Sequence, residues 1–207
     1  MKVIHRRTQS GCSHPTRADS CRRPKQRTRF GSLAEIVDDY KQNHQKGAIR
    51  EHDHYQSLTL EAAIKYAGWA MDGREKRYAH QRRIKRIALK NFEQQLSAKR
   101  DEIAACASFD DLYDLVWKIA DPLYGAGRLL AYDTALRLGA NVDKRPDRVY
   151  LHAGAKVGAN NLGYPRDWKH IEVEHLRQEL RGVRPEEVED ILCIYKDKLG
   201  KFKQPMP

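Results

Sequence analysis

The sequence predicts an all-α fold, and three observations carry this prediction. Apolar residues recur at steps of three and four positions in successive segments, which is the spacing of one helix face. Helix-start signals, such as a serine or threonine followed three residues later by an acidic residue, precede several of these segments. No segment alternates apolar and polar residues as a half-buried strand does, and there is no internal repeat. A single helical domain over residues 31–207 is therefore expected.

A basic arm precedes this domain. Residues 1–30 hold nine Lys/Arg residues and one acidic residue, so +8 of the net charge of +11 lies there. Large apolar side chains are nearly missing, and such a segment cannot bury enough surface to offset its chain entropy. We expect residues 1–30 to be a disordered basic tail. Its role stays open between a nonspecific phosphate-binding arm and a solvated extension that adds nothing to the fold.

Composition narrows the class of protein and its compartment. No apolar run approaches the roughly 20 residues of a membrane helix, and the N-terminus lacks the apolar stretch of a secretory signal. Four scattered cysteines indicate a reduced, intracellular protein, and the basic charge suits a polyanionic partner, so we expect a cytoplasmic, nucleoid-associated protein. The spacing of Cys12, His14 and Cys21 matches no usual zinc site. No metal site and no cofactor are predicted.

The first half of the domain is expected to hold three helices. Ser32-Leu-Ala-Glu35 has the pattern of a capping box at the start of a short helix, and a second helix follows Ser57 or Thr59. Between them, residues 42–56 are polar and are expected to form a solvated loop. A third helix carries an apolar series from Ile84 to Ile103.

A basic cluster opens the third helix and consists of Arg82, Arg83, Lys85 and Arg86. Positive charge at a helix start works against the helix dipole, so the cluster gains nothing locally. We therefore expect it to contact phosphate. The alternative is an ordinary solvated face.

Two further helices meet at a glycine-rich turn. Ser108 begins the first helix, Pro122 ends it, and the second runs from about Arg128 to Leu138. The turn between them reads Leu123-Tyr124-Gly125-Ala126-Gly127. Glycines beside a helix start leave backbone N–H groups uncovered, and the helix N-terminus carries partial positive charge. An anion, most simply a phosphate, fits there, and a plain tight turn is the alternative.

The segment from Leu123 to Ala131 resembles the hairpin of helix-hairpin-helix DNA-binding proteins and of the DNA glycosylase superfamily. The shared pattern is a hydrophobic residue, a Gly-hydrophobic-Gly turn and a small residue four positions after the second glycine. The resemblance spans about residues 118–158 and implies a glycosylase-like helical domain with its motif at about 109–139. It implies that double-stranded DNA is the partner. The expected DNA contacts are Leu123, Tyr124, Gly125, Ala126, Gly127, Arg128, Lys156 and the basic cluster.

The resemblance also implies a catalytic acid, but its register is ambiguous. Lyase-type members carry a lysine two positions beyond the second glycine, where this chain has Leu129, so a lyase mechanism at that position is excluded. Family spacing from Leu129 points to Asp147, whereas the local resemblance of Val149-Tyr-Leu-His152 to Val-Asp-Thr-His puts Tyr150 in the place of the acid. With Asp147 a monofunctional glycosylase remains open, and with Tyr150 the fold only binds DNA.

Three further expectations concern His152, Asp133 and Cys193. His152 is a third catalytic candidate, as a phosphate contact or proton donor, with a core histidine as the alternative. Asp133 is expected to pair with Arg137 one turn later. The iron–sulfur cluster of some glycosylases needs four close cysteines near the C-terminus, where Cys193 stands alone, so none is expected.

The rest of the chain is expected to be helical as well. Pro146 suits the first position of a helix running to residue 159, residues 173–180 suggest a short helix, and Pro185 opens the last one. Gly154 and Gly158, four positions apart, form a smooth face for another helix or for DNA.

Two functions follow from the sequence. The first is a DNA-binding protein of the helix-hairpin-helix kind, acting in DNA repair if it removes modified or damaged bases. The second is a non-enzymatic protein–protein interaction module, in which the smooth glycine face forms a helix–helix interface.

Overall fold

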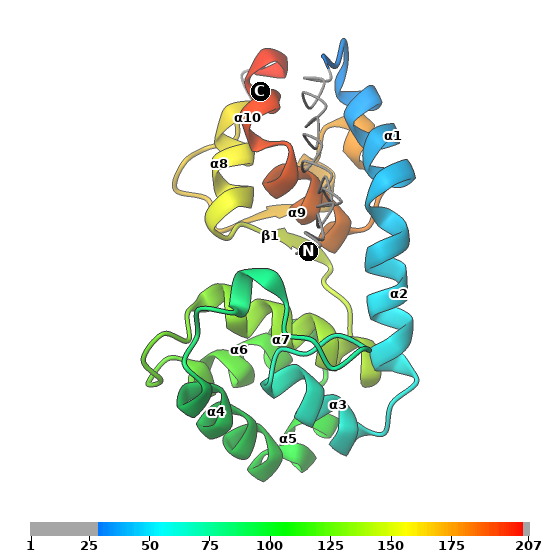
Figure 1. Cartoon of the computed structure of the whole chain (residues 1–207). Helices are drawn as coiled ribbons and strands as arrows, with labels where there is room; N and C mark the ends of the chain where they lie inside the picture. The colour runs from blue at the N-terminus through cyan, green and yellow to red at the C-terminus, as the bar shows by residue number, and fades with distance from the viewer. Residues whose placement is uncertain (1–28, 205–207) are drawn as a thin grey trace, which may run out of the picture.

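The molecule is predominantly helical and has two lobes in the computed structural model, which describes residues 29–204 (Figure 1). The predicted helical class is confirmed, with one two-stranded sheet in addition. None of the helices within residues 29–204 has both the length and the apolar character needed to cross a bilayer. The helices are α1 (Leu33–Asn43), α2 (Gln45–Gln56), α3 (Leu60–Gly68), α4 (Arg86–Ala98), α5 (Arg100–Ala105), α6 (Phe109–Ala120), α7 (Arg128–Asn141), α8 (Ala153–Leu162), α9 (Pro185–Ile194) and α10 (Lys196–Leu199).

The first lobe, here called the hairpin lobe, consists of α3 to α7 around one apolar core. Phe92, Leu112 and Leu138 are completely buried in it. A capping box starts α6, because the Ser108 hydroxyl accepts the Asp111 N–H (3.1 Å) and the Asp111 carboxylate accepts the Ser108 N–H (3.0 Å). Helix α6 ends just before Pro122, as the sequence predicts.

The second lobe, here called the terminal lobe, brings both ends of the described chain together. Helix α1 packs beside α9, and buried residues of α1, α9 and α10 belong to one apolar core. In Figure 1 the start of the described chain is blue and its end is red. Strand β1 (Arg148–Tyr150) pairs antiparallel with β2 (His170–Glu172), with Val149 opposite Ile171. Helix α8 lies against α9.

Helix α2 connects the two lobes, and the loop predicted for residues 42–56 is wrong. Tyr55 at its end is buried in the hairpin-lobe core, while the Gln45 side chain donates to Glu187 of α9 (2.9 Å). Only Tyr55 of this helix is fully buried. Its polar composition therefore reflects a helix that faces solvent and the space between the lobes, which composition alone does not distinguish from a loop.

Three further expectations are corrected by the structure. The helix predicted from Pro146 is replaced by β1, and α8 begins only at Ala153, because strands of three residues are too short to show alternation. The predicted helix over residues 84–103 divides into α4 and α5 at Lys99. Residues 173–180 form two 3₁₀ turns, Val173–His175 and Gln178–Leu180. The predicted tail, apart from residues 29 and 30, lies outside the described residues.

Candidate nucleic-acid interface and interlobe pocket

The turn between α6 and α7 is held by its own backbone. The Leu123 N–H donates to the Ala120 carbonyl and the Ala126 N–H donates to the Leu123 carbonyl, both at 2.9 Å. Gly125 has a φ of +87°, a left-handed conformation that favours glycine. Ala126 is buried in the hairpin-lobe core. The small apolar residue between the glycines therefore anchors the turn and leaves the glycines outside.

Both turn glycines present open backbone. A Cβ added to Gly125 or to Gly127 would meet no atom within 4 Å among the described residues. Gly127 is the N-cap of α7, with φ −94° and ψ 177°, and within the described chain no side chain caps that helix start. The first-turn N–H groups of α7 have no intrahelical acceptor, as at any helix start, so they are available to an external anion.

The basic cluster lies beside this turn. The Lys85 ammonium is 5.9 Å from the ring of Tyr124, whose side chain is 88% exposed. The Arg128 guanidinium stacks 4.3 Å from the ring of Trp117, on α6. Arg82, Arg83 and Arg86 are exposed on the same segment that carries Lys85. Hairpin and basic cluster thus form one surface, which we call the hairpin surface.

Asp147, the first catalytic candidate, lies apart from this surface. Its side chain is 75% exposed, and it forms an ion pair with Arg148 at 3.0 Å. Arg148 also contacts Asp110 of α6 (3.0 Å) and Glu172 of β2 (3.4 Å). Asp147 therefore belongs to a surface charge network at the start of β1.

Tyr150 and His152 lie in an aromatic cluster where the lobes meet. The His152 ring is 4.6 Å from the ring of Tyr132, and Tyr113 and Phe109 of α6 complete the cluster. Burial lowers the pKa of His152 to about 4, so the imidazole is neutral at pH 7 and cannot act there as a cationic proton donor. Lys156 is partly exposed on α8, in the terminal lobe rather than beside the hairpin.

Asp133 has different partners from the expected one. Its Oδ2 lies 2.7 Å from His80 Nε2 and accepts the Gln81 side-chain amide, also at 2.7 Å. The hydrogen bond to Asp133 raises the pKa of His80 above its ordinary value. The predicted pairing of Asp133 with Arg137 is therefore replaced by contacts with residues more than 50 positions earlier.

Arg137 is buried, and a separate set of groups holds it. Its Nε donates to Glu51 of α2 (2.8 Å), one terminal nitrogen donates to the Gln81 side-chain oxygen (3.3 Å), and its guanidinium lies 3.9 Å from the ring of Tyr78. Gln81 thus joins Arg137 to Asp133. A buried network with each member paired fixes its side chains in one arrangement.

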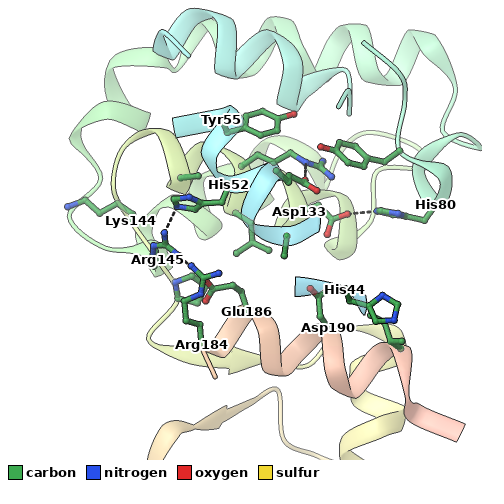
Figure 2. Close-up of a pocket in the computed structure, with 18 residues that line it drawn as sticks. His44, His52, Tyr55, His80, Asp133, Lys144, Arg145, Arg184, Glu186 and Asp190 are labelled. Atoms are coloured by element: carbon green, nitrogen blue, oxygen red, sulfur yellow. Dashed lines mark hydrogen bonds and ion pairs between the residues drawn. The ribbon is translucent and has the colours of Figure 1, made fainter. Parts of the chain in front are cut away.

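Glu51, Tyr78, His80, Asp133 and Arg137 line a cavity of about 310 Å³ between the lobes (Figure 2). Helix α7 supplies one wall, α9 the opposite wall and α2 a third. The lining residues are His44, Ala48, Glu51, His52, Tyr55, Tyr78, His80, Asp133, Leu136, Arg137, Ala140, Lys144, Arg145, Pro146, Arg184, Glu186, Asp190 and Ile194. We call it the interlobe pocket, and its size is within the range of small-molecule sites.

The α9 wall carries charged groups of both signs. Arg145 donates to the Glu186 carboxylate at 3.1 Å, and Arg184 lies 3.5 Å from the same group. Asp190 accepts the Tyr40 hydroxyl at 2.9 Å, and burial raises the pKa of Asp190 to about 6. The pocket thus contains a carboxyl group from each lobe, Asp133 and Asp190.

Sequence reasoning missed this pocket. Its walls come from four separate stretches of the sequence, and the Asp133–His80 and Tyr40–Asp190 contacts join residues 53 and 150 positions apart. The local signal is the spacing of Asp133, Leu136, Arg137 and Ala140, which places two charged and two apolar residues along one face of α7. From the sequence, Asp133 and Arg137 alone predict an ion pair within the helix.

The smooth glycine face of α8 is occupied within the chain. A Cβ added to Gly158 would overlap the carbonyl oxygen of Leu192, and one added to Gly154 would lie 2.5 Å from the Cys193 sulfur. The predicted close helix approach is confirmed, and its partner is α9. These glycines therefore offer no free face for a protein partner.

Metal ligation has no support in residues 29–204, where no group of three or more His, Cys, Asp and Glu side chains is placed to hold an ion. Cys12, His14 and Cys21 lie outside the described residues. No family model, curated protein or solved structure matches this chain.

Proposed function

We propose that this protein binds duplex DNA by holding a backbone phosphate at the hairpin between α6 and α7. The proposal rests on the pair of exposed glycines at the start of α7, where, among residues 29–204, no side chain caps the helix and an added Cβ would meet nothing within 4 Å. Bare N–H groups at a helix start, together with the helix dipole, form an anion site. Because glycine has no side chain, a phosphate diester can approach this backbone closely, and a larger residue at either position would block the approach.

The charges around the hairpin support a polyanionic ligand. Lys85 and Arg128 lie within ring contact of Tyr124 and Trp117, and three more arginines are exposed on the adjoining segment. Phosphate contacts position a protein on DNA without reading its sequence. We therefore expect affinity that falls steeply with salt and varies little between duplexes of different sequence.

Gly127→Val tests the hairpin directly. The φ and ψ of Gly127 are open to a β-branched residue, so the variant should fold, while its side chain blocks phosphate approach. We expect at least a tenfold loss of affinity for a fluorescent duplex in low salt, measured by anisotropy, with an unchanged melting temperature. Gly182→Val is the matched control, because an added Cβ at Gly182 also meets nothing within 4 Å. Parental affinity in folded Gly127→Val would contradict the proposal.

Base excision is the enzymatic form of the same proposal, and it would place the protein in DNA repair at the nucleoid. Leu129 stands where lyase-type members of the superfamily have the nucleophilic lysine, so the reaction would be hydrolysis with water as nucleophile. Asp147 is a poor candidate for the acid because it is largely exposed and paired with Arg148. Excision would appear as alkali-labile sites in duplexes that carry modified bases, and we expect Asp147→Asn to leave it unchanged.

A further inference from the structure

Helix α7 carries both the hairpin and the interlobe pocket. Leu129, Asp133, Arg137 and Ala140 follow one another at three- and four-residue steps, so they share one face of the helix. Leu129 is 38% exposed beside the hairpin glycines, and the other three line the pocket. At 1.5 Å per residue, Asp133 lies about 6 Å further along the helix than Leu129. The hairpin and Asp133 are therefore about one helical turn apart on the same face of α7.

Asp133 is a fixed acceptor in this pocket. His80 and Gln81 both bind its Oδ2, and Gln81 is held in turn by the buried Arg137. Its other oxygen, Oδ1, has no hydrogen-bond partner among the described residues, and Figure 2 shows the carboxyl group directed into the pocket from α7. A carboxylate oriented through one oxygen, with the other free, has the arrangement of an oriented general base.

Asp190 enters the pocket from the opposite lobe. Tyr40 donates to its Oδ2, and Figure 2 shows Asp190 on α9 across the pocket from Asp133. Burial raises the pKa of Asp190 to about 6, and the negative charge of Asp133 raises it as well, so Asp190 keeps its proton to a higher pH than an exposed carboxyl group does. The titratable and charged groups around it are Tyr40 of α1, Glu51 of α2, Asp133 of α7, Glu187 and Glu189 of α9, and the residues just before α2 and α9, His44 and Arg184.

The rest of the lining suits a flat, partly apolar group. Leu136, Ala140 and Ile194 supply apolar surface, and the aromatic residues Tyr55 and Tyr78 also line the pocket. A cavity of about 310 Å³ has room for a base with its sugar. Asp133 and Asp190 face this pocket from opposite walls, and glycosidic hydrolysis uses two carboxyl groups placed on either side of the bond that breaks.

We propose that Asp133 and Asp190 are the general base and general acid of a hydrolytic site that cleaves the N-glycosidic bond of a nucleotide, a step that rests on the DNA binding proposed above. Asp133 removes a proton from water as the water oxygen forms a bond to C1′ of the sugar. The bond between C1′ and the base nitrogen breaks, and Asp190 gives its proton to that nitrogen. The products are the free base and an abasic sugar, and solvent returns the proton from Asp133 to Asp190.

The test measures excision and binding on the same preparations of the full chain. Duplex oligonucleotides that carry uracil, hypoxanthine or an alkylated adenine opposite each normal base are incubated with protein, and abasic sites are cleaved with alkali. We expect the parent protein to release at least one of these bases. Asp133→Asn and Asp190→Asn should each lose at least 100-fold in rate, the usual range for a general acid or base, while binding duplex DNA with parental affinity.

A charge-matched control and a pH profile separate chemistry from structure. Asp197→Asn changes an exposed carboxyl group on α10 and should leave the rate unchanged. Because Asp190 acts in its protonated form, the rate should decline as pH rises through about 6, and Asp190→Asn should lack that decline. If Asp133→Asn fails to fold, His80→Ala serves in its place, because His80 is exposed, and we expect at least a tenfold loss with the pH profile displaced.

The two proposals fail in different ways. Parental binding by Gly127→Val contradicts the hairpin role and leaves the pocket variants to be judged by their rates. Normal binding with no excision of any tested base overturns the acid–base pair, as does excision that survives in both pocket variants at the parental rate.

Discussion

Two glycine pairs in this chain look alike in sequence and do opposite things in the structure. At the hairpin, Gly125 and Gly127 leave the backbone uncovered, and an added Cβ would stand in open space. On α8, Gly154 and Gly158 bring two helices together, and an added Cβ at Gly158 would overlap the backbone of α9. The first pair leaves space that a partner outside the molecule can occupy. The space beside the second pair is occupied by α9 of the same chain.

The comparison shows that the role of a glycine depends on which part of the molecule lies opposite it. Both pairs indicate that something approaches the backbone closely, and the local sequence specifies that much. What approaches is decided by the element on the opposite side, which comes from a distant part of the chain. The predictions below test whether the two pairs are separable in stability and in binding.

The largest effect is expected at Gly158. Gly158→Ala places a methyl group against the Leu192 carbonyl, and neither backbone can yield without moving α8 away from α9. Overpacking against rigid backbone should lower the free energy of unfolding by about 3 kcal/mol. Chemical denaturation followed by circular dichroism measures it, with Gly182→Ala as the control in open space. A loss below that of the control would mean that α8 and α9 do not pack as closely as described.

A smaller effect is expected at Gly125. Gly125→Ala forces a left-handed φ of +87° on a residue with a Cβ, which costs about 1 to 2 kcal/mol, although no atom is close enough to clash. Gly127→Ala, with a φ of −94°, should cost less because its conformation is an ordinary one. The same denaturation measurement compares the two variants. Equal losses would show that the left-handed turn is not maintained in solution.

The same distinction between local and distant contacts explains which parts of the fold and of the pocket can be predicted from the sequence. Ser108, Pro122 and the glycine turn act on their immediate neighbours, so the bounds of α6 and the start of α7 were predicted correctly. The pocket depends on His80 meeting Asp133 and on Tyr40 meeting Asp190, contacts that form only when the lobes assemble. Helix α2 was missed because it buries one residue and shows almost no apolar face.

The smallest effect on stability is expected from Lys85→Gln. This variant also tests whether the hairpin surface contacts phosphate. Lys85 is exposed, and its ammonium lies 5.9 Å from the ring of the exposed Tyr124, so its loss should not alter the free energy of unfolding measurably. If it neutralises one phosphate beside the hairpin, the slope of log affinity against log salt should become less steep by about 0.9.

The control for this slope is Lys41→Gln, which removes an exposed lysine from α1 in the terminal lobe. It changes the net charge by the same amount and lies on a different lobe from the hairpin. A slope that changes equally in both variants would mean that DNA responds to the total charge of the molecule. A change confined to Lys85→Gln assigns the phosphate contact to the hairpin surface, which is where the open glycine pair differs from the closed one.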